Sequence, residues 1–185
     1  MVTTSLRKNS LTLELLKIFR TVGFEAASLS KISEITGLGK ASLYHHFPGG
    51  KAQMIEEVLL FVEKWNYENI ISPLRSKDKP KKKLNTMMQS VSALYDGGKS
   101  GCVIGAVVYS DILNESNSKL KDILNQWIDE IEKVLIEEGI DKGEAALRAE
   151  DAVVRIQGSL VLAKATTRKS IFTRLVSNLA QELCS

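Results

Sequence analysis

A dense run of hydrogen-bond donors occupies residues 40–47, with the sequence KASLYHHF. The run is about two helical turns long, and Leu43 and Phe47, four residues apart, share the face that would be buried. Hydroxyl, imidazole and ammonium groups on the opposite face can contact the phosphates and base edges of duplex DNA. The outward-facing residues are Lys40, Ala41, Ser42, Tyr44, His45 and His46. This spacing predicts a short helix that contacts DNA.

The residues just before this run predict another short helix and a tight turn. Apolar residues recur at helical spacing from Leu29 to Ile35, and Ser28 can accept a free backbone N–H as the N-cap. Gly37 can adopt a positive φ without steric cost, so it can end this helix. The sequence Pro48-Gly49-Gly50 stops the next one. Together these signals predict a helix-turn-helix, whose second helix enters a major groove.

This part of the chain resembles the DNA-binding domain of the TetR family of bacterial transcriptional regulators. The match covers about residues 7–62 by motif and the remainder by the order of its helices. It is carried by Phe19, Gly23, Ser28-Leu29, Ile32, Gly37-Leu38 and the block from Lys40 to Phe47. The resemblance implies an all-α, nine-helix TetR-like fold. Residues 1–51 would form the helix-turn-helix head, and residues 52–185 the ligand-binding and dimerisation body.

The resemblance also implies roles for individual residues of the head. A Tyr, a His and a Lys just past the recognition helix hold phosphates in the family, which implies this role for Tyr44, His46 and Lys51. Residues at the start of the recognition helix read bases in the family. The expected DNA contacts are therefore Ser28, Lys40, Ala41, Ser42, Tyr44, His45, His46 and Lys51.

Two glycines depart from the family pattern. Gly39 stands where the family usually has Ser or Thr, so the recognition helix has a weaker cap. Gly50 stands where the family often has Lys, and the lysine comes one residue later. These departures keep a second interpretation open, in which the chain is a helical small-molecule or redox-sensing binding protein with weak or lost DNA affinity.

Charge along the chain supports the DNA-binding interpretation. Residues 1–51 hold seven Lys and Arg against three Glu, whereas residues 52–185 hold 18 Lys and Arg against 19 Asp and Glu. A locally basic head favours binding to DNA through release of counterions. Small domains often differ by a few charges, so this asymmetry supports the motif and does not replace it.

Composition indicates a soluble helical protein of the cytoplasm. The chain has three Pro in 185 residues, and no strand-like alternation interrupts its helical periodicity. The longest apolar run, near residues 102–109, is far shorter than the roughly 18 residues that span a bilayer. The N-terminus carries no apolar signal region. Two cysteines are too few for a disulfide scaffold and fit a reducing compartment.

The body is predicted to dimerise through its last two helices, near residues 144–166 and 169–183. One apolar stripe of the first helix comprises Ala149, Ala152, Val153, Ile156, Leu160 and Ala163, and a second comprises Val154, Gly158, Val161 and Ala165. A helix that is apolar on two sides must be covered on both, which favours a two-fold dimer through a four-helix bundle. The expected interface residues are Ile156, Leu160, Ala163, Phe172, Val176 and Leu179. Burial of this helix wholly within one chain is the alternative.

A pocket for a small-molecule effector is implied by the resemblance. The expected lining residues are Trp65, Met88, Cys102, Tyr109 and Trp127. Their large and adaptable side chains suit an apolar or aromatic ligand, although ordinary core packing would use the same residue types. Cys102 follows a glycine at a predicted helix start, where the helix dipole can favour a thiolate that senses oxidants or electrophiles. A buried, unreactive cysteine is the alternative.

Enzyme and metal chemistry find little support in this sequence. Both histidines lie in the DNA-binding motif, and no set of acid, base and nucleophile residues converges elsewhere. Adjacent residues on a helix point about 100° apart, so His45 and His46 do not form a metal site. No catalytic residue, metal or cofactor is expected. The sequence predicts a homodimeric repressor that binds a palindromic operator and is released by a small-molecule effector.

Overall fold

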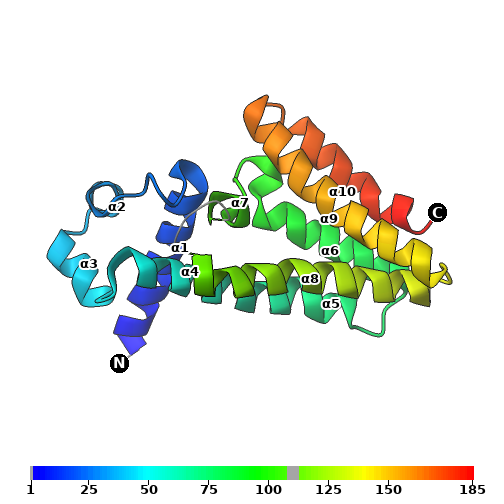
Figure 1. The fold of residues 1–185 in the computed structure, drawn as a ribbon, viewed down its shortest axis with the longest axis horizontal. Helices are drawn as coiled ribbons and strands as arrows, with labels where there is room; N and C mark the ends of the chain where they lie inside the picture. Colours follow the sequence, from blue (N-terminus) through cyan, green and yellow to red (C-terminus); the bar gives the residue numbers. More distant parts are fainter. Residues whose placement is uncertain (1, 108–112) are drawn as a thin grey trace. The chain divides into compact units, whose positions relative to one another are not determined.

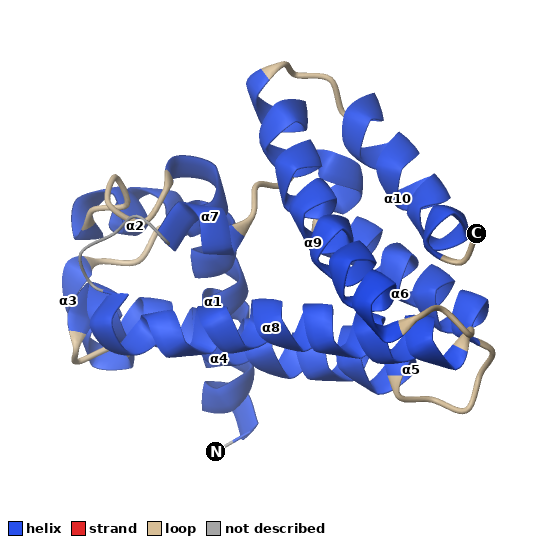
Figure 2. Cartoon of the chain, turned by 45° about the vertical axis from the view of Figure 1, so that its right-hand side comes forward, coloured by secondary structure: helices blue, strands red, loops and turns tan. Residues whose placement is uncertain are grey.

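The computed structural model describes residues 2–107 and 113–185 of the chain. Its helices are α1 (Val2–Val22), α2 (Leu29–Thr36), α3 (Lys40–His46), α4 (Gly50–Asn66), α5 (Ser72–Leu74), α6 (Pro80–Leu94), α7 (Val103–Val107), α8 (Leu113–Glu137), α9 (Lys142–Ala165) and α10 (Ser170–Leu183). A π-helical segment, Tyr67–Ile71, joins α4 and α5 into one continuous helix. Counted in this way the described residues form nine helices, as predicted, and Figure 2 shows helices and loops only among them.

The chain divides into two compact units, which we describe separately. The first unit contains Met1–Glu63 and Val103–Leu120, and the second contains Lys64–Cys102 and Lys121–Ser185. This division differs from the boundary expected after residue 51. The first part of α4 buries Met54, Ile55, Val58 and Leu59, and α7 packs on α1, so both segments join the head.

The head is organised around aromatic and branched side chains from α1, α2, α3 and the loop after α1, together with the buried residues of α4 given above. Phe19 of α1 and Phe24 of the following loop are fully buried, and their ring centroids lie 5.4 Å apart. Ile32 of α2, and Leu43 and Phe47 at α3, are also fully buried. These side chains fix the two helices of the motif against α1 and leave the opposite face of α3 free for a ligand.

The long helix after the head contains a widened turn. The backbone N–H of Ser72 donates to the carbonyl of Tyr67, a five-residue separation typical of a π-helix. Pro73 follows directly, and its ring would clash with the carbonyl four residues earlier in a regular α-helix. The π turn therefore lets the helix continue to Leu74, beyond the end near residue 71 that the sequence predicts.

The second unit is built around an antiparallel pair, α9 and α10. Figure 1 shows the two helices side by side, and α10 also packs on α6. Asp141 caps α9 by accepting N–H groups of Gly143 and Glu144. Buried residues from these helices form the core, namely Met87, Met88, Val91, Ala149, Ala152, Ile156, Phe172, Leu179 and Leu183. The rings of Phe172 and Tyr95 form a T-shaped pair, with centroids 6.0 Å apart.

Polar side chains far apart in sequence attach α8 to the rest of this unit. The Arg75 guanidinium donates to the Glu130 carboxylate at 2.8 Å. The Trp127 indole N–H donates to the Oδ1 atom of Asn66 at 2.5 Å, and both side chains are buried. Among the described residues, no helix is long and apolar enough to cross a membrane.

Candidate nucleic-acid interface

The first helix of the motif has both ends fixed by local hydrogen bonds. The Ser28 hydroxyl accepts the N–H of Lys31 at 3.2 Å, so Ser28 is the N-cap of α2, as the sequence predicts. Gly37 ends the helix with φ of 67°, the left-handed conformation that a residue with a Cβ rarely adopts. The length of α2 is therefore set by one hydroxyl and one glycine.

The turn between the two helices is fastened by two hydroxyl groups that sequence reasoning missed. Ser33 donates to the carbonyl of Leu38 at 2.6 Å. Thr36 donates to the carbonyl of Ile32 at 2.8 Å and accepts the N–H of Leu38 at 3.3 Å. Short polar side chains commonly bond to nearby backbone groups in this way. The presence of Ser33 and Thr36 close to Gly37 was therefore the signal in the sequence that could have predicted these bonds. They fix the angle at which α3 leaves the turn.

The recognition helix α3 presents its polar face to solvent. Lys40, Ala41, Tyr44 and His45 are exposed, with 48% of the Tyr44 surface accessible. Ser42 and His46 are half-buried. The structure thus brings together on one helix six of the eight residues predicted to contact DNA, with a seventh, Ser28, at the start of α2. Their roles toward DNA stay predictions.

The cap of α3 differs from that of α2. Gly39 occupies the N-cap position with φ of −62° and ψ of 153°, and its position supplies no side-chain hydrogen bond. A Cβ at this position would meet no atom within 4 Å. The weaker cap inferred from the sequence is therefore present, and nothing around Gly39 requires a glycine.

Lys51 does not join the face formed by α3. Its ammonium donates to the carbonyls of Phe24 at 2.8 Å and Glu25 at 3.3 Å, both in the loop between α1 and α2. It also lies 4.2 Å from the centroid of the Phe24 ring. The structure thus places the Lys51 ammonium at the α1–α2 loop, and its phosphate contact stays a prediction.

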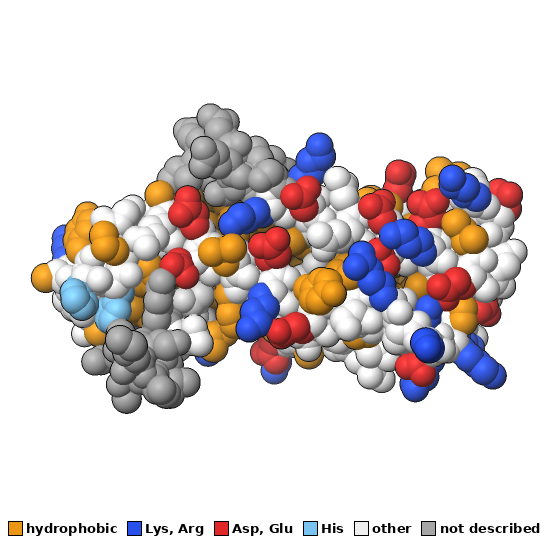
Figure 3. Space-filling view, turned by 90° about the horizontal axis from the view of Figure 1, so that it is seen from below, with side chains coloured by type: hydrophobic (Ala, Val, Ile, Leu, Met, Phe, Trp, Pro, Cys, Tyr) orange, Lys and Arg blue, Asp and Glu red, His pale blue; other side chains and the backbone are white. Residues whose placement is uncertain are grey.

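The two histidines lie at the protein surface, where Figure 3 shows their side chains in pale blue. Their ring centroids are 5.7 Å apart and the ring planes are inclined by 68°. The described residues contain no group of three or more His, Cys, Asp or Glu side chains placed to hold a metal ion. Each imidazole can instead act as a hydrogen-bond donor on the face of α3.

The structure does not gather the predicted ligand residues into one described cavity. Met88 and Trp127 are buried, and Trp65 is half-buried. The half-buried Cys102 has its sulfur 3.5 Å from the Tyr95 hydroxyl. Tyr109 lies outside the described residues. The Asn66 amide, which binds Trp127 in the core, is a polar neighbour that sequence reasoning missed because it lies 61 residues away.

The predicted dimer interface requires correction. Its six residues are all buried within the single chain, because they pack in the core of the second unit: Ile156, Leu160, Ala163, Phe172, Val176 and Leu179. The exposed stripe of α9 is the other one, where 67% of Val154 and 66% of Val161 are accessible. Sequence periodicity identified both stripes but does not reveal which side α10 covers, so the stripe that it assigned to a partner is the one that lies in the core of this chain.

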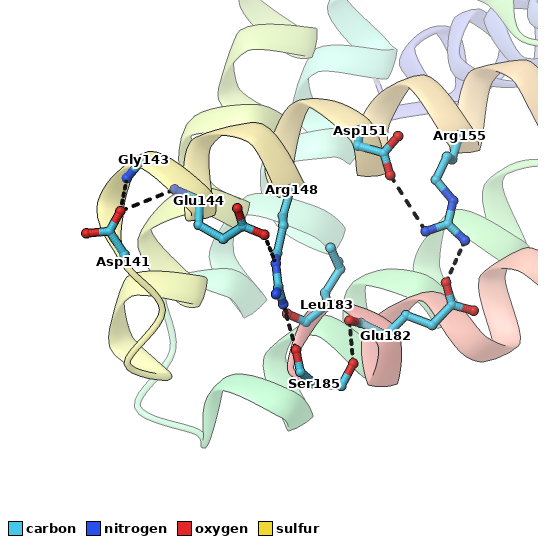
Figure 4. A network of polar contacts seen from close by, with 9 residues as sticks. All are labelled: Asp141, Gly143, Glu144, Arg148, Asp151, Arg155, Glu182, Leu183 and Ser185. Carbon is cyan, nitrogen blue, oxygen red and sulfur yellow. Dashed lines mark hydrogen bonds and ion pairs between the residues drawn. The ribbon is translucent and has the colours of Figure 1, made fainter.

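A groove of about 460 Å³ runs along this exposed side between α9 and α10. Its lining comprises Val154, Arg155, Gly158, Ser159, Leu162, Ile171, Arg174, Leu175, Asn178 and Glu182. Figure 4 shows Arg155 bridging Asp151 of its own helix and Glu182 of α10. Arg148 similarly joins Glu144 to the carbonyls of Leu183 and Ser185. These ties hold α10 and the residues that follow it against α9.

Comparisons with known proteins agree with this architecture. Residues 15–58 match the model of bacterial regulatory proteins of the tetR family, and residues 80–178 match the C-terminal domain of LmrA/YxaF-like transcriptional regulators. The HTH-type transcriptional regulator LmrA of Bacillus subtilis (strain 168) is 21% identical over 150 residues, which cover 79% of this chain and 80% of LmrA.

Solved structures share the fold at low sequence identity. A TetR transcriptional regulator from Legionella pneumophila superposes with a TM-score of 0.77 at 18% identity, covering 93% of this chain and 94% of that chain. The structure of AibR in complex with isovaleryl coenzyme A and operator DNA gives a TM-score of 0.65 at 18% identity, covering 82% of this chain and 86% of that chain. The family model covers more than half of the sequence and describes regulators, which agrees with the expectation that the chain is not an enzyme. The chain belongs to the TetR family of DNA-binding transcriptional regulators and has an LmrA/YxaF-like C-terminal domain.

Proposed function

We propose that this regulator is a cytoplasmic repressor that binds a palindromic operator as a homodimer and leaves it when a small molecule binds the body. The observation that carries the proposal is the exposed polar face of α3, held at a fixed angle by the Ser33 and Thr36 hydrogen bonds. A helix of this size, presented by a rigid turn, fits a major groove. Repression is the commoner mode in the family.

Tyr44 and Ser42 have different proposed roles at the operator. The exposed Tyr44 hydroxyl donates to a phosphate, so it contributes to binding on every sequence. Ser42, in the first turn of α3, reads a base edge together with Ala41.

The test compares two substitutions that each remove one hydroxyl. Tyr44→Phe should weaken binding to operator and random DNA by a similar factor, about 3- to 10-fold for one hydrogen bond. Ser42→Ala should change the preferred base at one position in a selection from random sequences. Equal losses from both variants on both kinds of DNA would contradict these assignments. If the selection with folded wild-type protein enriches no DNA sequence, the result would instead favour a helical small-molecule or redox-sensing binding protein with weak or lost DNA affinity.

A second copy of the chain is the proposed partner of the exposed α9 stripe. Val154 and Val161 flank Gly158, and a Cβ on Gly158 would meet no atom within 4 Å. The protomer therefore does not need a glycine here, whereas two helices that approach closely do. The apolar stripe continues beside the groove, which gives a partner helix a concave surface to enter.

Sedimentation of two variants tests this interface. Val161→Asp should convert the dimer to monomers, because a buried dimer contact would then contain an unpaired charge. Ile136→Asp, at another exposed apolar side chain on α8, is the matched control and should leave the dimer intact. Gly158→Ala raises helix propensity, so weaker dimerisation in this variant could not be attributed to a damaged protomer. A Val161→Asp protein that remains dimeric would contradict the proposed face.

The effector is proposed to be an apolar or aromatic small molecule, with acyl-coenzyme A esters as a class to test first. AibR, which shares the fold, was crystallised with isovaleryl coenzyme A and operator DNA. Effector and DNA should weaken each other's binding by the same free energy. Isovaleryl coenzyme A and a panel of aromatic compounds can be screened by thermal shift and then by release from the selected operator. A compound that stabilises the protein without changing operator affinity would not be the effector.

A further inference from the structure

The Lys51 side chain is held by a cage of groups from one short loop. Two of its three N–H groups donate to the Phe24 and Glu25 carbonyls, and the Phe24 ring lies beneath the cation. These partners precede Lys51 by 27 and 26 residues in the sequence. The lysine thus ties the first turn of α4 to the loop that connects α1 and α2.

The same loop determines where α2 begins. It starts at Gly23, which has φ of 83°, and ends at Ser28, the N-cap of α2. Phe24 and Ala27 are fully buried between these ends. The Phe24 N–H donates to the carbonyl of Ala106 on α7 at 3.4 Å, so both polar groups of this residue are bound. Lys51 completes the fixation of a loop whose movement would displace α2 and, through the turn, α3.

The turn before Lys51 is itself closely packed. Gly50 is buried with φ of 64°, and a Cβ on it would come within 3.7 Å of the Tyr44 ring. The chain therefore enters α4 through a left-handed residue packed beside Tyr44. Two hydrogen bonds and the cation–π contact hold the Lys51 ammonium at the α1–α2 loop, so only its third N–H is left for another acceptor, and only from that fixed position.

We propose that Lys51 is a positioning residue for DNA binding: it holds the α1–α2 loop so that the helix-turn-helix has its binding geometry, and it makes no phosphate contact. The proposal rests on the DNA binding assigned above. It assigns to this chain a role for the lysine opposite to the one that the sequence pattern suggests.

The slope of affinity against salt separates the two roles. Each cation that neutralises a phosphate adds about 0.9 to the slope of log K against log salt concentration. Lys51→Met keeps the apolar stem over Phe24 and removes the donors. We expect about tenfold weaker operator binding, the equivalent of one charge-assisted hydrogen bond, with the slope of the wild type unchanged. Amide hydrogen exchange should accelerate in residues 24–32, which a lost phosphate contact would not cause.

Lys40→Met is the matched control, because Lys40 is an exposed cation on the recognition helix. It should lower the slope by about one and leave hydrogen exchange of the loop unchanged. A Lys51→Met protein that shows this same pattern would overturn the proposal. If neither the wild type nor the control binds an operator, the proposed function fails, whereas the exchange measurement still reports on the loop.

Lysine reactivity in the wild-type protein tests the proposal without any substitution. Limited acetylation followed by mass mapping should find Lys51 slow to react with and without operator, since its ammonium is bound in both states. Lys40 should react readily in the free protein and become protected by DNA. A Lys51 that reacts readily in the free protein and is protected only by DNA would be a phosphate ligand, and the proposal would be wrong.

Discussion

The hydrogen bonds within the head and those within the second unit join residues at very different separations in the sequence. The bonds that shape the helix-turn-helix join residues two to five apart, as in the pairs made by Ser28, Ser33 and Thr36. The ties of α8 in the second unit join residues 54 to 61 apart, as in the pairs made by Lys83 and Trp127. The geometry of the helix-turn-helix is therefore specified by residues close together in the sequence, whereas the packing of the second unit depends on how distant segments are brought together.

The largest expected effect concerns the core of the second unit. Trp127→Ala should lower the free energy of unfolding by about 3–5 kcal/mol, because it opens a cavity and leaves Asn66 without its donor. Trp127→Phe should cost about 1 kcal/mol, since it removes the N–H and little volume. Urea denaturation measures both. Hydrogen exchange in α2 and α3 should stay at wild-type rates, and equal loosening of both units would contradict the comparison.

A smaller effect should distinguish the two partners of one ion pair. Lys83 is only 4% exposed and is bound by Glu137, which is 52% exposed. Glu137→Gln leaves a buried ammonium without a counter-charge and should cost about 2 kcal/mol. Lys83→Met fills the same space with an apolar chain and should cost under about 1 kcal/mol. Urea denaturation of both variants, completed to a double-mutant cycle, checks this order, and a larger loss from Lys83→Met would refute it.

The pH dependence of stability should contain a contribution from Glu130. The Arg75 guanidinium, with help from Lys133, holds the pKa of this buried carboxyl below its usual 4.5. The folded protein therefore binds this proton less readily than the unfolded chain, so the contribution is complete above pH 4.5 and is lost as pH falls through the folded-state pKa. Its size should be below that of the Glu137 effect, because Arg75 and Lys133 remain hydrated.

Thermal unfolding between pH 3 and pH 6 can be compared for the wild type and Glu130→Gln. The two curves should converge toward low pH and separate above the usual pKa of the carboxyl. Parallel curves over the whole range would show that Glu130 titrates identically in the folded and unfolded states. The Arg75–Glu130 ion pair would then not contribute to the pH dependence of stability.

The smallest effect belongs to the head and uses the same substitution at two positions. Gly39→Ser supplies the missing cap of α3 in open space and should stabilise the head by about 0.5 kcal/mol. Gly37→Ser, two residues earlier, forces a side chain into positive φ and should destabilise it by about 1 kcal/mol. Thermal unfolding and exchange of α3 amides measure both. Changes of the same sign would refute this local account of the head.

The sequence predicted much of the head because its determinants are neighbours. Ser28 and Gly37 end α2 by their own side-chain and backbone preferences, so their positions were sufficient to locate the helix. Lys51 is the exception, and its partners in the α1–α2 loop are distant in sequence. A motif can identify such a lysine, but only the packed loop reveals that its ammonium is already bound.

In the body, the sequence predicted the number of helices correctly but did not identify which apolar side of α9 faces the core. Helical periodicity gave two apolar stripes on α9, and both exist. Which stripe faces the core depends on where α10 lies, and that position follows from tertiary contacts such as the Arg155–Glu182 pair. Trp127 and Met88 were similarly recognisable as large apolar residues, whereas their burial in the core required the surrounding helices.

The π turn has a consequence for how this helix tolerates insertion and deletion. Val62, Asn66, Ile70 and Leu74 are all buried and follow each other at intervals of four residues. In a regular α-helix each such step drifts by about 40° around the axis, so the last would face well away from the first. The wider turn at Tyr67–Ile71 absorbs the drift. Loss of a single residue there would turn the segment into a regular α-helix and place the former Ile70 and Leu74 seven and eleven residues after Val62, still within about 20° of the buried face, so a one-residue deletion should be tolerated better here than in the flanking turns.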